Sequence, residues 1–184
     1  MVYKMRMTVS DQDLALAAAS GDGHAFEALL ARHYDRLFAL CFRFTGHRTD
    51  AEDLCQDICA VLPARLESYR GQAKVTTWLY RVAHNAAIDR RRRASSYARA
   101  LDGWGDWETG RQAAMAEDQA NVAWLHTAMG QLSETLRDTL ALVLDDLTQA
   151  EVGEIMGVSE GTIAWRVSEA KKRLREIREK EEAT

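Results

Sequence analysis

The sequence predicts an all-α protein made of two small helical domains joined by a flexible linker. Its 184 residues contain a single proline and are 47% hydrophobic, which is typical of helices around well-filled cores. Apolar residues recur at helical spacing through most of the chain. This pattern is lost over residues 97–117, so we predict a first domain over residues 1–96 and a second over residues 118–184.

The first domain is expected to begin with a short helix and a long one. Ser10 can cap the short helix, which is predicted to run through Ala19. Gly21 and Gly23 are expected to interrupt the chain before a long amphipathic helix. The apolar stripe of that helix stops at Gly46, which we predict as its end.

A third helix is predicted to open with a capping box, because Thr49 is followed by a glutamate three residues later. Pro63 lies within this helix and is expected to kink it. In the loop that follows, Gly71 is the predicted turn and Thr76 the predicted cap of the next helix. The exposed side of the third helix is acidic, which either stabilises its N-terminus or forms a docking surface for a basic partner.

The helix of residues 77–93 carries groups suited to opened nucleic acid. At roughly 100° per residue, Trp78, Arg81 and Asn85 share one face, which continues through Asp89 and Arg92. An indole can stack on a base, an amide can bond a base edge, and four consecutive arginines suit a phosphate backbone. Separately, each feature has a structural alternative: a core tryptophan, a tolerated surface amide and a solvated helix end.

The loop before this helix, residues 67–75, adds Tyr69, Arg70 and Lys74. Aromatic and basic groups beside a base-reading helix could form a pocket for an extruded base, and a plain surface loop is the equal alternative. After residue 96 the composition becomes acidic, and Trp104 and Trp107 in this linker suggest docking on a partner or on the flanking domains.

The second domain ends in a helix-turn-helix pattern. Ser133 caps one predicted helix, and Thr148 opens a capping box at the start of the next. Gly153 is small enough for two helices to approach, Gly157 makes the turn, and Ser159 caps the final helix. A helical hairpin without a DNA role is the alternative. The expected buried stripe of the final helix is Ile163, Val167, Ala170, Leu174 and Ile177.

The charge distribution, the cysteines and the hydropathy limit the classes of protein to which this chain can belong. The formal net charge is −4, but residues 81–99 and 158–180 are basic blocks that an acidic segment separates, which suggests two nucleic-acid surfaces. Neither a signal peptide nor a membrane span is recognisable, so we expect a cytoplasmic protein without membrane insertion. Cys41, Cys55 and Cys59 fit a reducing compartment. A zinc or redox site with His47 stays open, but interface cysteines are favoured, and we expect no metal and no cofactor.

In the order of its motifs the chain resembles bacterial RNA polymerase sigma factors of the extracytoplasmic-function (ECF) type. The blocks that carry the resemblance are GDGHAFEALLARHYDRL, DAEDLCQDI and TWLYRVAHNAAIDRRRR, then TQAEVGEIMGVSEGTIAWRVSEAKKRL after a gap. They look like regions two and four of the family. A helix-turn-helix alone would be weak support, since many regulators have one, but the first three blocks beside it are specific.

The resemblance implies a specificity subunit, not an enzyme by itself, that binds core RNA polymerase, directs it to promoter DNA and is held inactive by an anti-sigma factor. We expect a monomer when it is free. The implied polymerase-binding residues are Asp50, Asp53, Leu54, Gln56 and Asp57. Those implied for the −10 element are Tyr69, Arg70, Lys74, Trp78, Arg81, Asn85, Arg91 and Arg92. Those implied for the −35 element are Ser159, Thr162, Trp165, Arg166, Glu169, Lys172 and Arg173.

The final helix departs from the family pattern. Where relatives usually carry Lys or Arg, Ser and a further Arg, this chain has Ala164, Trp165 and Glu169, while Arg166 is kept. Glu169 is expected to point into the groove, where it can accept from the amino group of cytosine. Two other classes remain: a regulator of duplex operators, which needs only the second domain, and a metal or redox sensor that uses the cysteines.

Overall fold

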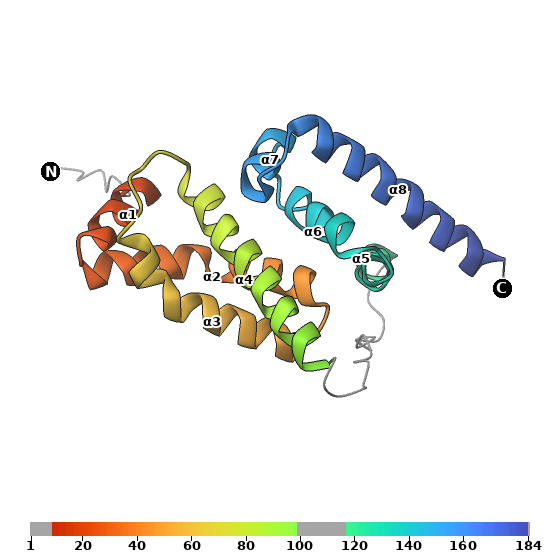
Figure 1. Cartoon of the computed structure of the whole chain (residues 1–184), viewed down its shortest axis with the longest axis horizontal. Coiled ribbons are helices and arrows are strands. Elements are labelled where there is room, and N and C mark those ends of the chain that lie inside the picture. The colour runs from red at the N-terminus through yellow and green to blue at the C-terminus, as the bar shows by residue number, and fades with distance from the viewer. Residues whose placement is uncertain (1–8, 99–116, 184) are drawn as a thin grey trace, which may run out of the picture.

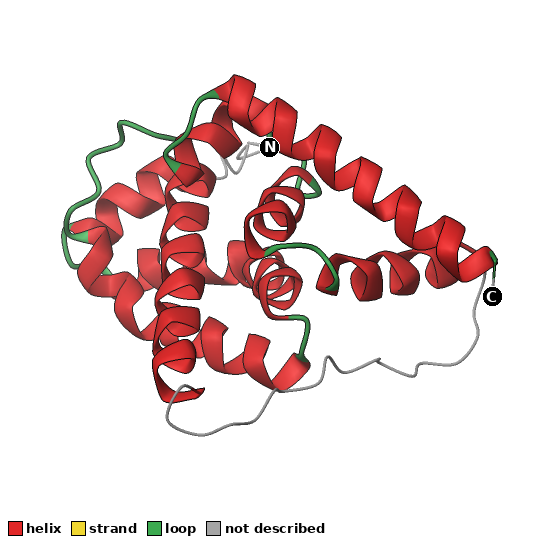
Figure 2. Cartoon of the chain, turned by 45° about the vertical axis from the view of Figure 1, so that its right-hand side comes forward, coloured by secondary structure: helices red, strands yellow, loops and turns green. Residues whose placement is uncertain are grey.

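The computed structural model describes residues 9–98 and 117–183 (Figure 1). Over these residues it is all-α, as predicted, with eight helices and no strand (Figure 2). The N-terminal half holds α1 (Asp11–Ala19), α2 (Gly23–Thr45), α3 (Arg48–Leu66) and α4 (Val75–Ala98). The C-terminal half holds α5 (Glu117–Gly130), α6 (Glu134–Val143), α7 (Gln149–Met156) and α8 (Glu160–Glu182). Residues 99–116 of the predicted linker, which include Trp104 and Trp107, lie outside the described residues.

The first two helices have ends that the sequence predicts. The hydroxyl of Ser10 accepts a hydrogen bond from the backbone N–H of Asp13 at 3.1 Å and caps α1. Gly46 ends α2 in the left-handed conformation, with φ of 75°. One detail differs, because Gly23 begins α2 instead of interrupting the chain, and the carboxylate of Asp22 supplies its cap.

The starts of α3 and α4 correct two predictions. The helix α3 begins at Arg48 with His47 at the cap position and no side-chain cap bond, so the capping box at Thr49 does not form. The reason is that the helix starts one residue before Thr49, so this residue is inside the helix, and Glu52 instead accepts a hydrogen bond from Arg48 Nε at 2.9 Å. The helix continues through Pro63 to its end at Leu66. The helix α4 begins at Val75, so the predicted cap Thr76 lies inside it.

One apolar core runs through both halves. It joins Leu37, Leu40 and Phe44 of α2 to Met129 and Leu132, and it continues into α7 and α8. The helix α2 packs on α6, and α4 packs on both α3 and α7 (Figure 1). The helix α4 therefore lies between α3 and the first helix of the helix-turn-helix.

A second, smaller core ties α1 to α2 and to the loop before α4. Its buried members include Leu14, Leu29, Leu66 and Val75. This packing fixes the loop and the first turn of α4. Among the described helices, none combines the length and the apolar character that crossing a membrane requires.

Candidate nucleic-acid and polymerase interfaces

The loop that leads into α4 is held by the N-terminal half. Tyr69, which the sequence places in a possible base pocket, is only 4% exposed, because its ring packs edge-on against Trp78 with 5.6 Å between ring centroids. Its hydroxyl donates to the carbonyl oxygen of Ala73 at 2.7 Å. Gly71 makes the turn with φ of 72°, and its carbonyl accepts from Gln12 Nε2 at 3.3 Å. In this structure Tyr69 therefore supports the loop.

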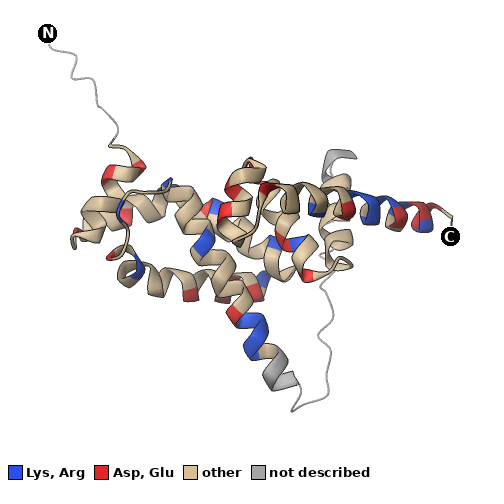
Figure 3. Cartoon of the chain, turned by 45° about the horizontal axis from the view of Figure 1, so that its top comes forward, with Lys and Arg blue, Asp and Glu red and all other residues tan. Residues whose placement is uncertain are grey.

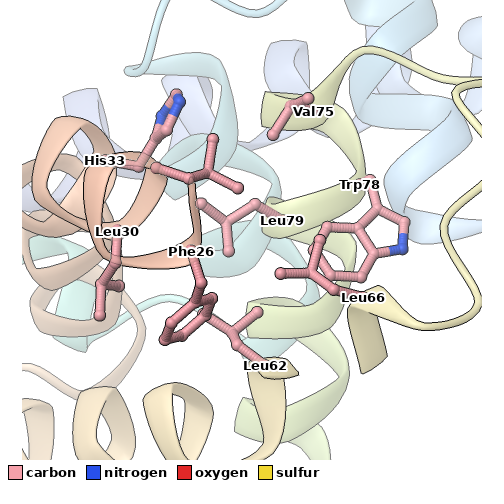
Figure 4. A pocket seen from close by; sticks show the side chains of 9 residues that line it. Phe26, Leu30, His33, Leu62, Leu66, Val75, Trp78 and Leu79 are labelled. Carbon is pink, nitrogen blue, oxygen red and sulfur yellow. The ribbon is translucent and has the colours of Figure 1, made fainter. Parts of the chain in front are cut away.

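The indole of Trp78 is half-buried at the edge of an apolar pocket (Figure 4). The pocket is lined by Phe26, Leu29, Leu30, His33, Leu62, Leu66, Val75, Trp78 and Leu79. Its volume of about 20 Å³ leaves room for about one water molecule, so it cannot hold a base in this arrangement. Trp78 therefore packs in part against the core, as one of the two interpretations expects, while the rest of its indole is accessible.

Two basic side chains of the −10 set are paired with carboxylates of α7. Lys74 Nζ lies 2.6 Å from Glu151 Oε1, and the Arg81 guanidinium lies 2.8 Å from Glu154 Oε1. The hydrogen bond from Lys74, followed by those from Thr148, lowers the pKa of Glu151 to about 2. Arg70 differs, because its guanidinium bonds the carbonyl oxygens of Glu67 and Tyr69 in its own loop.

Four consecutive arginines form a basic stretch towards the end of α4 (Figure 3), and they differ in the residues that they contact. Arg90 reaches back to α3 and lies 3.0 Å from Asp50 and 3.1 Å from Asp53. Arg91 reaches forward to α6 and forms a two-pronged contact with Asp138 at 3.1 and 2.5 Å. Arg92 and Arg93 are exposed. The interpretation as a solvated helix end therefore applies to the last two arginines only.

Asp138 is a functional candidate that the sequence interpretation missed. It is 2% exposed and lies 3.5 Å from His84 Nε2, beside its contact with Arg91. Burial alone would raise the pKa of Asp138, but hydrogen bonds from His84 and Arg91 outweigh it and lower the pKa. The available signal was a charged pair, Arg137 and Asp138, within an otherwise apolar run.

A second missed contact lies at the end of α6. Asp145 accepts from Arg43 at 2.6 Å and from the hydroxyl of Tyr80, so it joins α2, α4 and the turn after α6. Burial, together with the hydrogen bond to Asp145, raises the pKa of Tyr80. The side chains of Arg43 and Asp145 are each 13% exposed, which makes this a mostly buried ion pair between the halves.

The acidic side of α3 is open to solvent over most of its length. Asp53, Gln56 and Asp57 are exposed and Asp50 is half-buried. Arg90 lies along this row, 3.7 Å from Asp57 at its far end. Leu54, which the resemblance assigns to polymerase binding, is 1% exposed, because it faces the core. Its contribution to this surface is therefore to hold α3 in place.

The helix-turn-helix forms as the sequence predicts. The side chains of Thr148 and Glu151 cap each other's backbone in a complete capping box. Gly157 ends α7 with φ of 69°, and the hydroxyl of Ser159 caps α8 by accepting from the N–H of Thr162 at 3.2 Å. A Cβ at Gly153 would lie 2.7 Å from the carbonyl oxygen of Val158, so only glycine allows this close turn.

The outer face of α8 presents an aromatic group and several charges. Trp165 is 64% exposed, whereas Thr162 and Arg166 are half-buried, and Arg166 contacts the sulfur of Met156. Lys172 and Arg173 are exposed further along the helix. Glu169 accepts from Arg173 Nε at 3.0 Å and is 24% exposed, so it lies along the helix in contact with its own neighbour.

The three cysteines lie on α2 and α3. Cys41 and Cys55 are buried and Cys59 is half-buried. Burial, followed by the proximity of Cys59, raises the pKa of Cys55 to about 11, which keeps this thiol protonated at neutral pH. The described residues hold no group of three or more His, Cys, Asp or Glu side chains that could bind a metal ion.

Comparison with known families accounts for both halves. The family model for sigma-70 region 2 matches residues 29–97, and the model for sigma-70 region 4 matches residues 123–174. The chain resembles RpoE of Bartonella quintana, solved in complex with the anti-sigma factor NepR, with a TM-score of 0.74. The identity is 24%, and the match covers 84% of this chain and 96% of that one, which shows the fold.

Relatives of similar length carry the assignment further. The ECF RNA polymerase sigma factor SigM of Mycobacterium tuberculosis is 30% identical over 90% of this chain and 83% of its own length. The ECF RNA polymerase sigma factor SigW of Bacillus subtilis is 27% identical over 84% of this chain and 89% of its own. With regions 2 and 4 matched in order and a relative of this identity over most of both lengths, the chain belongs to the ECF family of RNA polymerase sigma factors.

Proposed function

We propose that this ECF sigma factor binds core RNA polymerase through the acidic side of α3, the −10 element through α4 and the −35 element through α8. One observation carries the proposal. The three faces lie on separate helices, and α4 lies between α3 and α7, so the acidic side of α3 stays exposed whatever the helix-turn-helix contacts. This arrangement lets one chain bind a protein partner and two DNA elements.

The −10 surface consists of the α4 face and the loop before it. Asn85 is exposed in mid-helix and is the group best suited to bond a base edge. Lys74, Arg81 and Arg91 supply phosphate contacts, and Arg92 is exposed at the end of the row. Trp78 and Tyr69 support this surface through their mutual ring contact, and the accessible part of Trp78 can stack on an unpaired base.

The −35 surface is the first half of α8. Trp165 offers an apolar face to a thymine methyl group, and Arg166 can bond guanine or hold a phosphate. Ser159 and Thr162 lie at the N-terminus of the helix, where backbone N–H groups favour a phosphate. Lys172 and Arg173 extend the basic character along the helix.

Polymerase binding is assigned to Asp53, Gln56 and Asp57, which are exposed on the acidic side of α3, with Asp50 beside them. The solved relative bound to NepR supports a further proposal, that an anti-sigma factor controls this chain too. We propose that it acts in the cytoplasm beside polymerase, as a monomer when free, and without catalytic activity of its own.

The test is transcription by core polymerase from promoter fragments with randomised −10 and −35 positions, with the transcripts sequenced. We expect enriched sequences at both positions only when this protein is added. The control is Asp53→Arg with Asp57→Arg, which should abolish assembly with core polymerase because the surface it meets should be basic. Normal assembly by this variant would refute the docking surface. Binding to duplex sites without any effect on transcription would favour an operator-binding regulator.

A further inference from the structure

The loop of residues 67–75, which we call the −10 loop, lies against α1 (Figure 1). The side-chain amide of Gln12 donates a hydrogen bond to the carbonyl oxygen of Gly71 at 3.3 Å. We propose that α1 holds the −10 loop in the position that base recognition requires, and that Gln12 is the positioning residue, acting through Gly71. This inference rests on the proposed −10 function of the loop and of α4.

The middle of the −10 loop depends on this contact, because its two ends are fixed by other means. At one end Tyr69 packs against Trp78, and at the other Val75 is 5% exposed in the smaller core. The residues between these ends are exposed or half-buried. The hydrogen bond from Gln12 to Gly71 joins residues 59 positions apart, so it ties this middle part to α1.

Gly71 allows the close approach of the loop to α1. Its φ of 72° lies in the left-handed region that glycine adopts most easily. A Cβ at this position would lie 2.9 Å from the side-chain nitrogen of Gln12 and 3.9 Å from a methyl group of Leu16. The Gln12 side chain is flexible and would move aside, but it would then lose its bond to the loop. Alanine at Gly71 should therefore separate the loop from α1.

Two basic residues of the −10 set flank Gly71. Arg70 precedes it directly, and Lys74 follows three residues later. The groups of a binding site must be held within about 0.5 Å of their productive geometry. A displaced Gly71 therefore shifts the DNA strand that these cations hold relative to Asn85 on α4. Base selection should suffer more than overall attraction to DNA, because charges act over about 8 to 10 Å whereas a hydrogen bond needs direct contact.

The helix α1 is itself anchored, so it can hold the loop. Asp11 in its first turn lies 2.8 Å from Arg32 Nη1 and 2.8 Å from Nε2 of the buried His33, both on α2. His33 in turn lines the pocket at whose edge Trp78 lies (Figure 4). The consecutive residues Asp11 and Gln12 thus connect α2 and the −10 loop through one turn of helix.

The contact itself is tested by limited trypsin digestion of the free protein, since trypsin cleaves after Arg70 and Lys74 inside the loop. Gln12→Met keeps the length of the side chain and removes the donor. We expect cleavage at these two sites to be about fivefold faster in this variant, the factor that corresponds to one neutral hydrogen bond. Gln131→Met makes the same change at an exposed residue of the C-terminal half and should cleave like the wild type.

The functional role is tested by transcription with core polymerase from promoters that are randomised at the −10 positions. Gln12→Met should lower the enrichment of the preferred −10 sequence about fivefold and leave the −35 preference unchanged. A merely structural role would reduce the yield from all sequences alike and keep the preference. Gly71→Ala should also weaken the −10 preference, and adding Gln12→Met to it should cause no further loss, because both changes break the same contact.

Three results would overturn the positioning role: equal cleavage after Arg70 in Gln12→Met and Gln131→Met, an unchanged −10 preference in Gln12→Met, or additive losses in the double variant. A wild-type protein that selects a −10 sequence would then show that the proposed function stands without it. If the wild type selects no −10 sequence although Gln12→Met loosens the loop, the proposed function fails. The role of Gln12 in base recognition fails with it, and only the contact between α1 and the loop remains.

Discussion

At the scale of single residues, exposure could be predicted from the sequence but partners could not. Asn85 and Arg92 are exposed on the face that helical spacing predicts. Arg90 and Arg91 are adjacent in the same run, yet one contacts α3 and the other contacts α6. Their carboxylate partners are 40 and 47 residues away in the sequence. Only the packing of the helices therefore determines which carboxylate each arginine contacts.

The base-reading role proposed for Asn85 gives the first prediction. Asn85→Ala should weaken formation of the open promoter complex by about 1 to 3 kcal/mol, because one specific amide contact to a base is lost. Core polymerase binding should be unchanged, since it is proposed to depend on α3. The measurement is permanganate reactivity of the −10 region, with Asp35→Ala, an exposed change on α2, as the control. If the −10 region reacts with permanganate as strongly with the Asn85 variant as with the wild type, Asn85 has no base-reading role.

At the scale of elements, local capping signals predict the start of some helices and fail at others. The helix-turn-helix follows the sequence prediction because Thr148, Gly157 and Ser159 act through contacts within three or four residues. The same signal is wrong at Thr49, because α3 already begins at Arg48 and Thr49 lies inside the helix. A capping box thus forms only where its threonine is the last residue before the helix, and the spacing alone does not fix that position.

The close turn of the helix-turn-helix predicts that alanine substitutions at two glycines change the stability of the fold in opposite directions. Gly153→Ala should destabilise the fold by about 1 to 3 kcal/mol, because its Cβ would lie 2.7 Å from the Val158 carbonyl oxygen. Gly161→Ala should instead stabilise it by up to about 1 kcal/mol, since its nearest neighbour is 4.0 Å away and alanine favours helices. Urea unfolding measures both, and equal effects of the two variants would contradict the close approach.

The helix α8 gives a third prediction. The contact of Glu169 with Arg173 favours a position along the backbone side of the helix, in contrast to the groove position that the sequence suggests. Glu169→Gln should therefore release Arg173 to phosphates and raise affinity for all −35 sequences. Trp165→Ala should instead change which sequences are preferred, because it removes an exposed apolar contact. Selection of bound sequences from a randomised −35 library distinguishes these outcomes. If Glu169→Gln alters the preferred sequence, Glu169 points into the DNA groove, as the sequence suggests.

The pKa of Glu151 gives a pH prediction. Because the pKa falls from 4.5 to about 2 in the folded chain, its ionised form stabilises the fold fully above about pH 4.5 and progressively less down to about pH 2. The melting temperature of the wild-type protein should therefore drop more steeply across this window than that of Glu151→Gln, which can keep a cap bond to Thr148. Parallel pH profiles would show that other carboxylates dominate acid unfolding.

At the scale of the whole molecule, the packing of the two halves is what the sequence did not reveal. The loss of helical periodicity predicts separate domains, yet Leu40 of α2 and Leu142 of α6 share one core. Beside this apolar core, the interface contains acidic and basic residues such as Arg91 and Asp138, which would be expected to lie in solvent if each helix were considered alone. Asp145 and Arg43 are 102 residues apart, and no local pattern connects them.

This shared interface predicts how the chain unfolds. The wild-type protein should unfold in one cooperative transition, because its apolar core is continuous across the halves. Asp145→Ala leaves Arg43 mostly buried without its carboxylate and removes the acceptor of the Tyr80 hydroxyl, which should cost about 3 to 5 kcal/mol. That loss falls on the contact between the halves, so calorimetry should resolve two transitions in this variant.

Asp35→Ala, an exposed change on α2, should keep one transition. A single transition for Asp145→Ala, merely shifted to lower temperature, would show that the halves remain one cooperative unit without this ion pair.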